Sequence, residues 1–158
     1  MTINEIKTIN PTAFQSVDQI VIWRDSHVKM VMPDGKTQSI DYVNQRLDIM
    51  PESIDKVVIH CTRGFLWAPE AVIYEARRIL RRNGRIFLTF YHDEEIGLIS
   101  KWISKIRSKN QWKMDHVVNI INASDLLIDK NIIIENDLMY FEVIKMENEK
   151  LERYIFSS

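Results

Sequence analysis

Two neighbouring stretches decide the fold: DKVVIHC (residues 55–61) and APEAVIYEARRILRRNGRIFLTFY (residues 68–91). The first contains a short, continuous, β-branched run, which is typical of a strand covered on both faces in a parallel sheet. In the second, apolar residues recur at spacings of three and four, so a helix is predicted from Pro69 to Arg82. Gly84 is expected to end this helix in a left-handed conformation, and residues 85–91 then form the next strand. This order of strand, helix and strand indicates an α/β fold with a mostly parallel core.

Downstream of this unit, the sequence predicts more helix and a terminal pair of strands. An amphipathic pattern covers about residues 93–109, and apolar pairs indicate a further helical region over 115–128. Residues 131–135 and 138–146 are expected to form two strands around Asn136-Asp137, which is a hairpin signal. The C-terminal end of the sheet should therefore be antiparallel.

The N-terminal part contains two short β-rich runs, 19–24 and 28–32, followed by a polar connection over 36–47 that includes a weak strand. Only residues 25–27 separate the two runs, whereas parallel neighbours need a connection of a dozen or more residues. The runs therefore predict a hairpin, and the N-terminal half of the α/β sheet is abbreviated.

Composition bounds the class of protein. The chain has 158 residues, a formal charge of −1 and 46% hydrophobic residues, which fits one globular domain over 1–158 and excludes a disordered chain. Its four glycines are too far apart for a GxGxxG or GxxxxGK phosphate loop. The single cysteine, Cys61, and four scattered histidines show no spacing typical of a metal site, so no metal is expected.

The same sequence gives expectations about location. No apolar run approaches the ~20 residues needed to cross a bilayer, and the N-terminus lacks a basic start followed by an apolar core. We therefore expect a cytoplasmic protein without membrane association.

Charge is distributed unevenly along the chain. Residues 77–113 carry 10 basic and 3 acidic side chains, a local charge of +7. Such a stripe can bind phosphate groups, but no aromatic-basic motif of an RNA-binding sheet accompanies it. We favour the solvated face of two helices over a nucleic-acid surface.

The run LDIMPESIDKVVIHC (residues 47–61) and the helix and strand of 68–91 together resemble class I S-adenosylmethionine-dependent methyltransferases. In that family an acidic residue precedes a Leu-Pro-like turn, followed by a D-x-V-V strand and a helix that ends in E-x-x-R-x-L-x-x-G-G. The corresponding positions here are Asp48, Met50-Pro51, Asp55–Val58, Glu75–Leu80 and Asn83-Gly84. The resemblance covers about residues 46–146. It implies a Rossmann-like, mostly parallel sheet with a C-terminal antiparallel hairpin, S-adenosylmethionine as cofactor, and methyl transfer to a small molecule or macromolecule.

The resemblance also implies where the cofactor would bind. Asp34 could stand in for the acid that binds the ribose, and Asp48 with Ile49 lie where the family contacts adenine. His60 follows the central strand, at the carboxyl edge where open α/β sheets bind ligands. For each residue there is a structural alternative: a turn residue for Asp34, local backbone contacts for Asp48, and polar packing for His60.

The loop after the central strand supplies candidates for substrate contact. Arg63 could bind a carboxylate or phosphate, and Phe65 and Trp67 could stack on a flat substrate. Capping of the core beneath the following helix is the structural alternative for the two aromatic residues. No catalytic residue can be assigned, because methyl transfer depends mostly on positioning.

The family's first strand normally ends in a glycine-rich loop, and no glycine stands at that place here. Two functions follow as hypotheses: a methyltransferase, or a non-catalytic module that has lost the cofactor site. The second predicts a homodimer or a protein partner, since a sheet without one of its helices leaves a face or edge uncovered.

Overall fold

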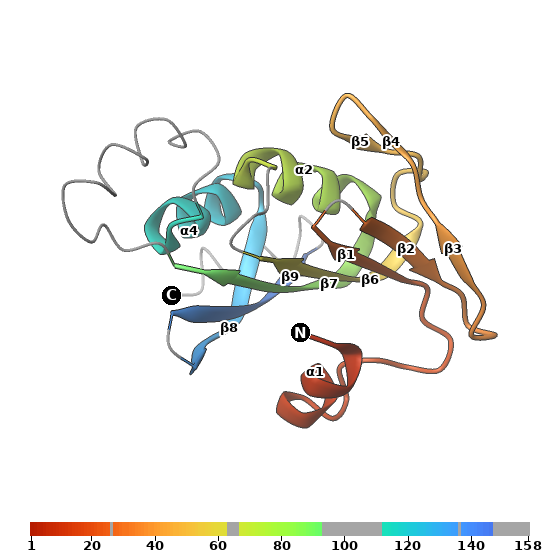
Figure 1. The fold of residues 1–158 in the computed structure, drawn as a ribbon, viewed down its shortest axis with the longest axis horizontal. Coiled ribbons are helices and arrows are strands. Elements are labelled where there is room, and N and C mark those ends of the chain that lie inside the picture. Colours follow the sequence, from red (N-terminus) through yellow and green to blue (C-terminus); the bar gives the residue numbers. More distant parts are fainter. Residues whose placement is uncertain (26, 63–66, 93–111, 136, 147–158) are drawn as a thin grey trace.

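The computed structural model describes residues 1–25, 27–62, 67–92, 112–135 and 137–146. Seven strands form one sheet in the order β3-β2-β1-β6-β7-β9-β8 (Figure 1). Their bounds are Ile20–Arg24 (β1), His27–Val31 (β2), Thr37–Ser39 (β3), Ile54–Cys61 (β6), Leu80–Tyr91 (β7), Leu126–Glu135 (β8) and Leu138–Lys145 (β9). Two further strands, β4 (Tyr42–Val43) and β5 (Arg46–Leu47), form a separate small hairpin.

The centre of the sheet is parallel. Strand β6 pairs in parallel with β1 on one side and with β7 on the other. The last two strands are antiparallel, since β9 pairs with β7 and β8 pairs with β9. This arrangement confirms the expected α/β class with an antiparallel C-terminal hairpin.

The N-terminal half is abbreviated, as the short connection predicted. β1 and β2 are antiparallel neighbours, and Arg24 at the end of β1 lies opposite His27 at the start of β2. β3 extends this meander by pairing antiparallel with residues 29–31. Among the described residues, no crossover helix therefore lies between β1 and β2.

The helices of the described residues lie on both faces of the sheet (Figure 1). Helices α2 (Pro69–Ile79) and α4 (Met114–Ala123) lie on one face, above the larger core cluster, which includes the interior-facing residues of all three parallel strands. The short helix α1 (Ile3–Ile9) lies on the opposite face over a smaller cluster around Ile6, Val58 and Phe87. Within the described residues, no helix is long and apolar enough to cross a membrane.

The junction between α2 and β7 differs from the prediction. The helix ends at Ile79 rather than Arg82, and β7 begins at once with Leu80, which pairs with Ile54. Asn83, with φ +66°, adopts the left-handed conformation that we assigned to Gly84. Gly84 is needed for space instead, because a Cβ there would lie 2.6 Å from Leu80 Cγ.

Two other regions differ from the prediction, and one is not tested. α1 was not predicted, although Thr2 and Glu5 form a capping box at its start. The helical region expected over 115–128 stops at Ala123, and β8 already begins at Leu126. The helix expected over 93–109 lies outside the described residues.

Candidate functional site

The carboxyl ends of β1 and β6 lie side by side and carry polar residues. Parallel pairing places Arg24 beside His60, and Asp25 and Thr62 follow directly after these strands. Asp25 has φ +54°, because it begins the tight turn into β2. Thr62 Oγ1 donates a hydrogen bond of 2.5 Å to Asp25 Oδ1, which ties the turn to the end of β6.

His60 is a buried titratable side chain at this edge. It is 8% exposed, and its Nδ1 lies 2.6 Å from the hydroxyl oxygen of Thr89 on β7. Burial lowers the pKa of His60 to about 4, so its imidazole is neutral at neutral pH. A neutral imidazole can donate through one nitrogen and accept through the other.

A cavity of about 270 Å³ opens beside His60 on the face of the sheet that carries α1. Its lining comes from the first residues of the chain and from β1 and β6, including Thr2, Asn4, Ile22, Arg24 and Val58. A mixed apolar and polar lining of this size is compatible with a small organic ligand.

The structure does not bring the four predicted cofactor residues together. Asp34 lies in the turn after β2, at the amino end of β1, where its carboxylate accepts a 2.9 Å hydrogen bond from the amide of Lys36. Asp48 is exposed, whereas Ile49 is buried in the larger cluster with α2. His60 faces the opposite side of the sheet, so these residues do not surround one common space.

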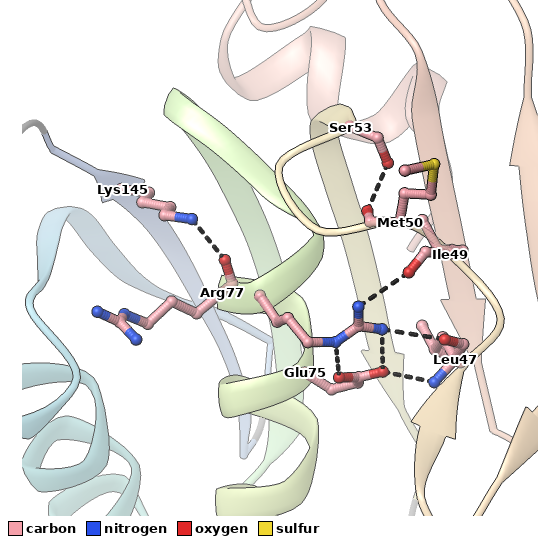
Figure 2. A network of polar contacts seen from close by, with 8 residues as sticks. Leu47, Ile49, Met50, Ser53, Glu75, Arg77 and Lys145 are labelled. Atoms are coloured by element: carbon pink, nitrogen blue, oxygen red, sulfur yellow. Dashed lines mark hydrogen bonds and ion pairs between the residues drawn. The ribbon is translucent and has the colours of Figure 1, made fainter.

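Glu75 and Arg78 of α2 explain the position of the segment around Asp48 (Figure 2). The carboxylate of Glu75 accepts from Arg78 Nε at 2.5 Å and from the backbone amide of Leu47. Arg78 also donates to the carbonyl oxygens of Leu47 at 3.0 Å and Ile49 at 2.9 Å. The Glu-x-x-Arg motif that carries part of the resemblance therefore holds residues 47–49 against α2.

The end of α2 is held by contacts from outside the helix. The amides of residues 52 and 53 donate to the carbonyls of Arg78 and Ile79 at 3.0 and 2.9 Å. Lys145, the last residue of β9, donates through Nζ to the carbonyl of Arg77 at 2.9 Å (Figure 2). The same Nζ also donates to the carbonyl of Leu80 at 2.8 Å. These donors satisfy the carbonyls that a helix leaves free at its C-terminus.

Of the three loop candidates, the structure describes Trp67. Its side chain is 8% exposed and makes edge-on ring contacts with Trp23 and Tyr42 at 5.1 and 4.9 Å. The carbonyl of Trp67 accepts a hydrogen bond from Trp112. Trp67 thus packs in the core at the start of α2, whereas Arg63 and Phe65 lie outside the described residues.

Sequence reasoning missed the partners of His60 and Asp25. Thr89 lies in register with His60 on the neighbouring strand, which the parallel pairing of the two predicted strands could have indicated. The contact between Asp25 and Thr62 depends on the turn geometry after β1, and no sequence signal marks it.

The arginines at the start of the basic stretch (residues 77–113) form ion pairs with acidic side chains. Each of the five between residues 77 and 85 lies within 4.0 Å of a carboxylate oxygen, in the pairs Arg77–Asp125, Arg78–Glu75, Arg81–Asp55, Arg82–Glu52 and Arg85–Asp129. This pairing agrees with a solvated surface for this part of the stretch.

The described residues at the end of β1 do not provide the glycine-rich cradle that the resemblance associates with S-adenosylmethionine. The place of the family's glycine-rich loop is taken by the tight turn at Asp25, whose carboxylate is already bonded to Thr62. The chain then returns directly as β2, antiparallel to β1. A backbone cradle for the cofactor is not formed by these residues.

Comparison with solved structures relates about two-thirds of this chain to one group of proteins. No protein-family model and no curated protein match the sequence. Among solved structures, an S-adenosylmethionine-dependent methyltransferase from Aquifex aeolicus superposes with a TM-score of 0.52 at 8% identity, over 69% of this chain and 55% of that one. A methyltransferase of the same class from Methanosarcina mazei gives a TM-score of 0.52 at 12% identity, over 66% and 65%.

A third similar structure is a Haloferax volcanii methyltransferase in complex with the Trm112 activator, with a TM-score of 0.50 at 13% identity, over 65% of this chain and 59% of that one. The chain thus spans between 55% and 65% of the length of these three proteins. The parallel centre and the antiparallel end of the sheet fit this fold. This chain has the fold of class I S-adenosylmethionine-dependent methyltransferases.

Proposed function

We propose that this chain is a non-catalytic module with the methyltransferase fold, which acts by association with a second copy of itself. The tight β1–β2 turn is the observation that supports a non-catalytic function. It occupies the place where the family's cofactor loop leaves the first strand, and it is fixed by the bond between Asp25 and Thr62. The spread of Asp34, Asp48 and His60 over separate places supports the same reading.

Methyl transfer is the competing function, and a binding experiment separates the two. Isothermal titration with S-adenosylmethionine and with its demethylated product should give no heat of binding at millimolar ligand. Saturable binding of either compound would overturn the non-catalytic assignment and restore a methyltransferase.

The two edges of the sheet differ in their capacity for association. β3 has three residues, all polar and exposed. This edge is therefore too short and too polar to favour pairing with a strand of another chain. β8 has ten residues and pairs with β9 on one side. Near its end it exposes three consecutive isoleucines, Ile132, Ile133 and Ile134, and long apolar edge strands are templates for pairing with another chain.

A second copy is the partner that we propose for β8. Two identical edge strands can pair antiparallel about a twofold axis, so both copies bury the same surface. Protein association also occurs with this fold, as in the Haloferax volcanii methyltransferase with its Trm112 activator.

Light scattering over micromolar concentrations tests this association. The wild-type chain should approach twice the monomer mass, and Ile133→Lys should remain monomeric because the charge lies within the paired edge. Val17→Lys is the matched control, because Val17 and Ile133 are both 69% exposed and Val17 lies outside the sheet. A monomeric wild type, or equal dimerisation of both variants, would refute the β8 interface.

A further inference from the structure

The cavity beside His60 is lined by positive charge. Arg24 and Met1, with its α-amino group, both line it, and no aspartate or glutamate is among the described residues that line it. The other lining residues are uncharged or neutral at neutral pH and include the apolar side chains of Ile22 and Val58. A cleft lined by charges of one sign attracts ligands of the opposite sign, so this cavity favours an anion.

Arg24 has no acidic partner of its own. Within the described residues it makes no ion pair, whereas each of the five arginines between residues 77 and 85 lies within 4.0 Å of a carboxylate oxygen. Burial lowers the pKa of the Met1 amino group, Glu5 opposes this shift, and Arg24 lowers the pKa further. The effect of Arg24 is repulsion between like charges, which an anion bound between them would relieve.

The acidic side chains nearest to the cavity are engaged elsewhere. The carboxylate of Asp25 accepts a 2.5 Å hydrogen bond from the hydroxyl of Thr62, and that of Glu5 accepts a 2.5 Å hydrogen bond from the amide of Thr2. Neither acid lines the cavity. The described part of the chain therefore supplies no carboxylate of its own to this space.

His60 is compatible with an anionic ligand. Its Nδ1 lies 2.6 Å from the hydroxyl oxygen of Thr89, and this hydroxyl can either donate to Nδ1 or accept from it. Either ring nitrogen of the neutral imidazole can therefore carry the proton. A carboxylate, which only accepts hydrogen bonds, would favour the form in which the second nitrogen is the donor.

The walls and the charge together define the ligand. The volume of about 270 Å³ exceeds the roughly 150 Å³ of an engineered apolar cavity that binds benzene, so a ring or a short aliphatic chain has room beside Ile22 and Val58. An ammonium group on the ligand would be repelled by Arg24. We propose that this cavity binds a small monocarboxylate that has an apolar body and no amino group, with its carboxylate held by Arg24.

Benzoate, benzamide and acetate test the two parts of this proposal. Benzoate and benzamide have nearly the same shape and differ in charge, whereas acetate has the charge without the ring. One charge-assisted hydrogen bond predicts that benzoate binds about tenfold more tightly than benzamide. Acetate should also bind more weakly than benzoate, because it leaves the apolar walls in contact with water.

Titrations followed by NMR locate the binding, since the ring signals of His60 should shift with benzoate. Benzamide or acetate binding as tightly as benzoate, or unchanged His60 signals with millimolar benzoate, would overturn the proposal.

Three variants identify the residues involved. Arg24→Gln should bind benzoate and benzamide equally, whereas Arg46→Gln should keep the preference, because Arg46 is exposed like Arg24 but does not line the cavity. Ile22→Trp should abolish binding of both aromatic probes by filling the cavity, and it provides a second test if Arg24→Gln does not fold. Preference that survives in Arg24→Gln, or binding that survives in Ile22→Trp, would refute the site.

The cavity lies at the same edge of the sheet as the Asp25 turn, on which the proposed function rests, so S-adenosylmethionine is a further ligand in these titrations. Its carboxylate is accompanied by an ammonium group and a sulfonium, so it should not displace benzoate. Displacement would overturn both the exclusion of amino groups and the non-catalytic assignment. Binding of S-adenosylmethionine without displacement would overturn the non-catalytic assignment alone, and failure of benzoate to bind would overturn the carboxylate site alone.

Discussion

Replacing Glu75 with glutamine removes the charge that holds Arg78 and the backbone of Leu47 in place. The side chains of Glu75 and Arg78 are 7% and 20% exposed, so the pair is largely shielded from water. Glutamine keeps one acceptor oxygen but turns the other position into a donor, which must face either the guanidinium or the Leu47 amide. Oε2 of Glu75 accepts from both the Leu47 amide and Arg78 Nη2, and Oε1 accepts from Arg78 Nε. Whichever way the glutamine amide turns, at least one of these donors loses its acceptor and the charge of the pair is lost.

The expected loss of stability is about 3 kcal/mol, at the lower end of the roughly 3–5 kcal/mol for breaking a buried pair. The lower end applies because Arg78 keeps the carbonyl oxygens of Leu47 and Ile49 as partners. Urea unfolding followed by tryptophan fluorescence measures this loss, since Trp23 and Trp67 are buried.

The matched control is Glu70→Gln, the same change on the same helix. Glu70 is 40% exposed and pairs with His116 at 2.6 Å, so its loss should cost under about 1 kcal/mol. The reasoning is refuted if Glu75→Gln lowers the free energy of unfolding by no more than Glu70→Gln does. Hydrogen exchange gives a local check, because a neutral acceptor holds the Leu47 amide less strongly than a carboxylate does. Protection of this amide should therefore fall in Glu75→Gln and stay unchanged in Glu70→Gln.

Three further changes have defined outcomes. Gly84→Ala should lower the free energy of unfolding by about 1–3 kcal/mol in urea, because the new Cβ meets Leu80, and an unchanged midpoint would contradict the close approach. The pKa of His60, about 4 in the folded chain and 6.5 when unfolded, means that the unfolded state binds the proton more tightly. Stability should therefore fall by about 3 kcal/mol as the pH drops from 6.5 to 4; His60→Gln should lack this part of the loss, and identical pH profiles would count against it. Cys61 is 1% exposed and burial raises the pKa of its thiol, so a disulfide reagent should label it only after unfolding, and rapid labelling of the folded chain would disagree.

The local pattern of apolar residues in the sequence was sufficient to predict the strand and the helix at the centre of the fold. The continuous β-branched run at 57–59 forms part of β6, and the apolar stripe with helical spacing forms α2, although this helix ends at Ile79 rather than at Arg82. The three residues between the first two strands are too few for a parallel connection, so they correctly predicted an antiparallel hairpin.

The candidate site was harder to predict, because it depends on which face of the sheet each residue presents. Asp48 and His60 both stand near strand ends in the sequence pattern, and the resemblance placed them around one ligand. In the structure, Arg78 and Glu75 hold the segment of Asp48 against α2, while His60 faces α1. This separation follows from contacts between residues about 30 positions apart, which no local pattern records.

The contact of Lys145 with the end of α2 has a consequence for folding during synthesis. Lys145 binds the carbonyl of Arg77, which precedes it by 68 positions in the chain. While the ribosome still holds β9, the last turn of α2 lacks this cation, and β7 lacks its antiparallel neighbour. Chains synthesised from the N-terminus can form α2 early, but they complete its end only when β9 emerges. A chain stopped before β9 should therefore be captured by chaperones or degraded, whereas the full-length chain closes the sheet in one late step.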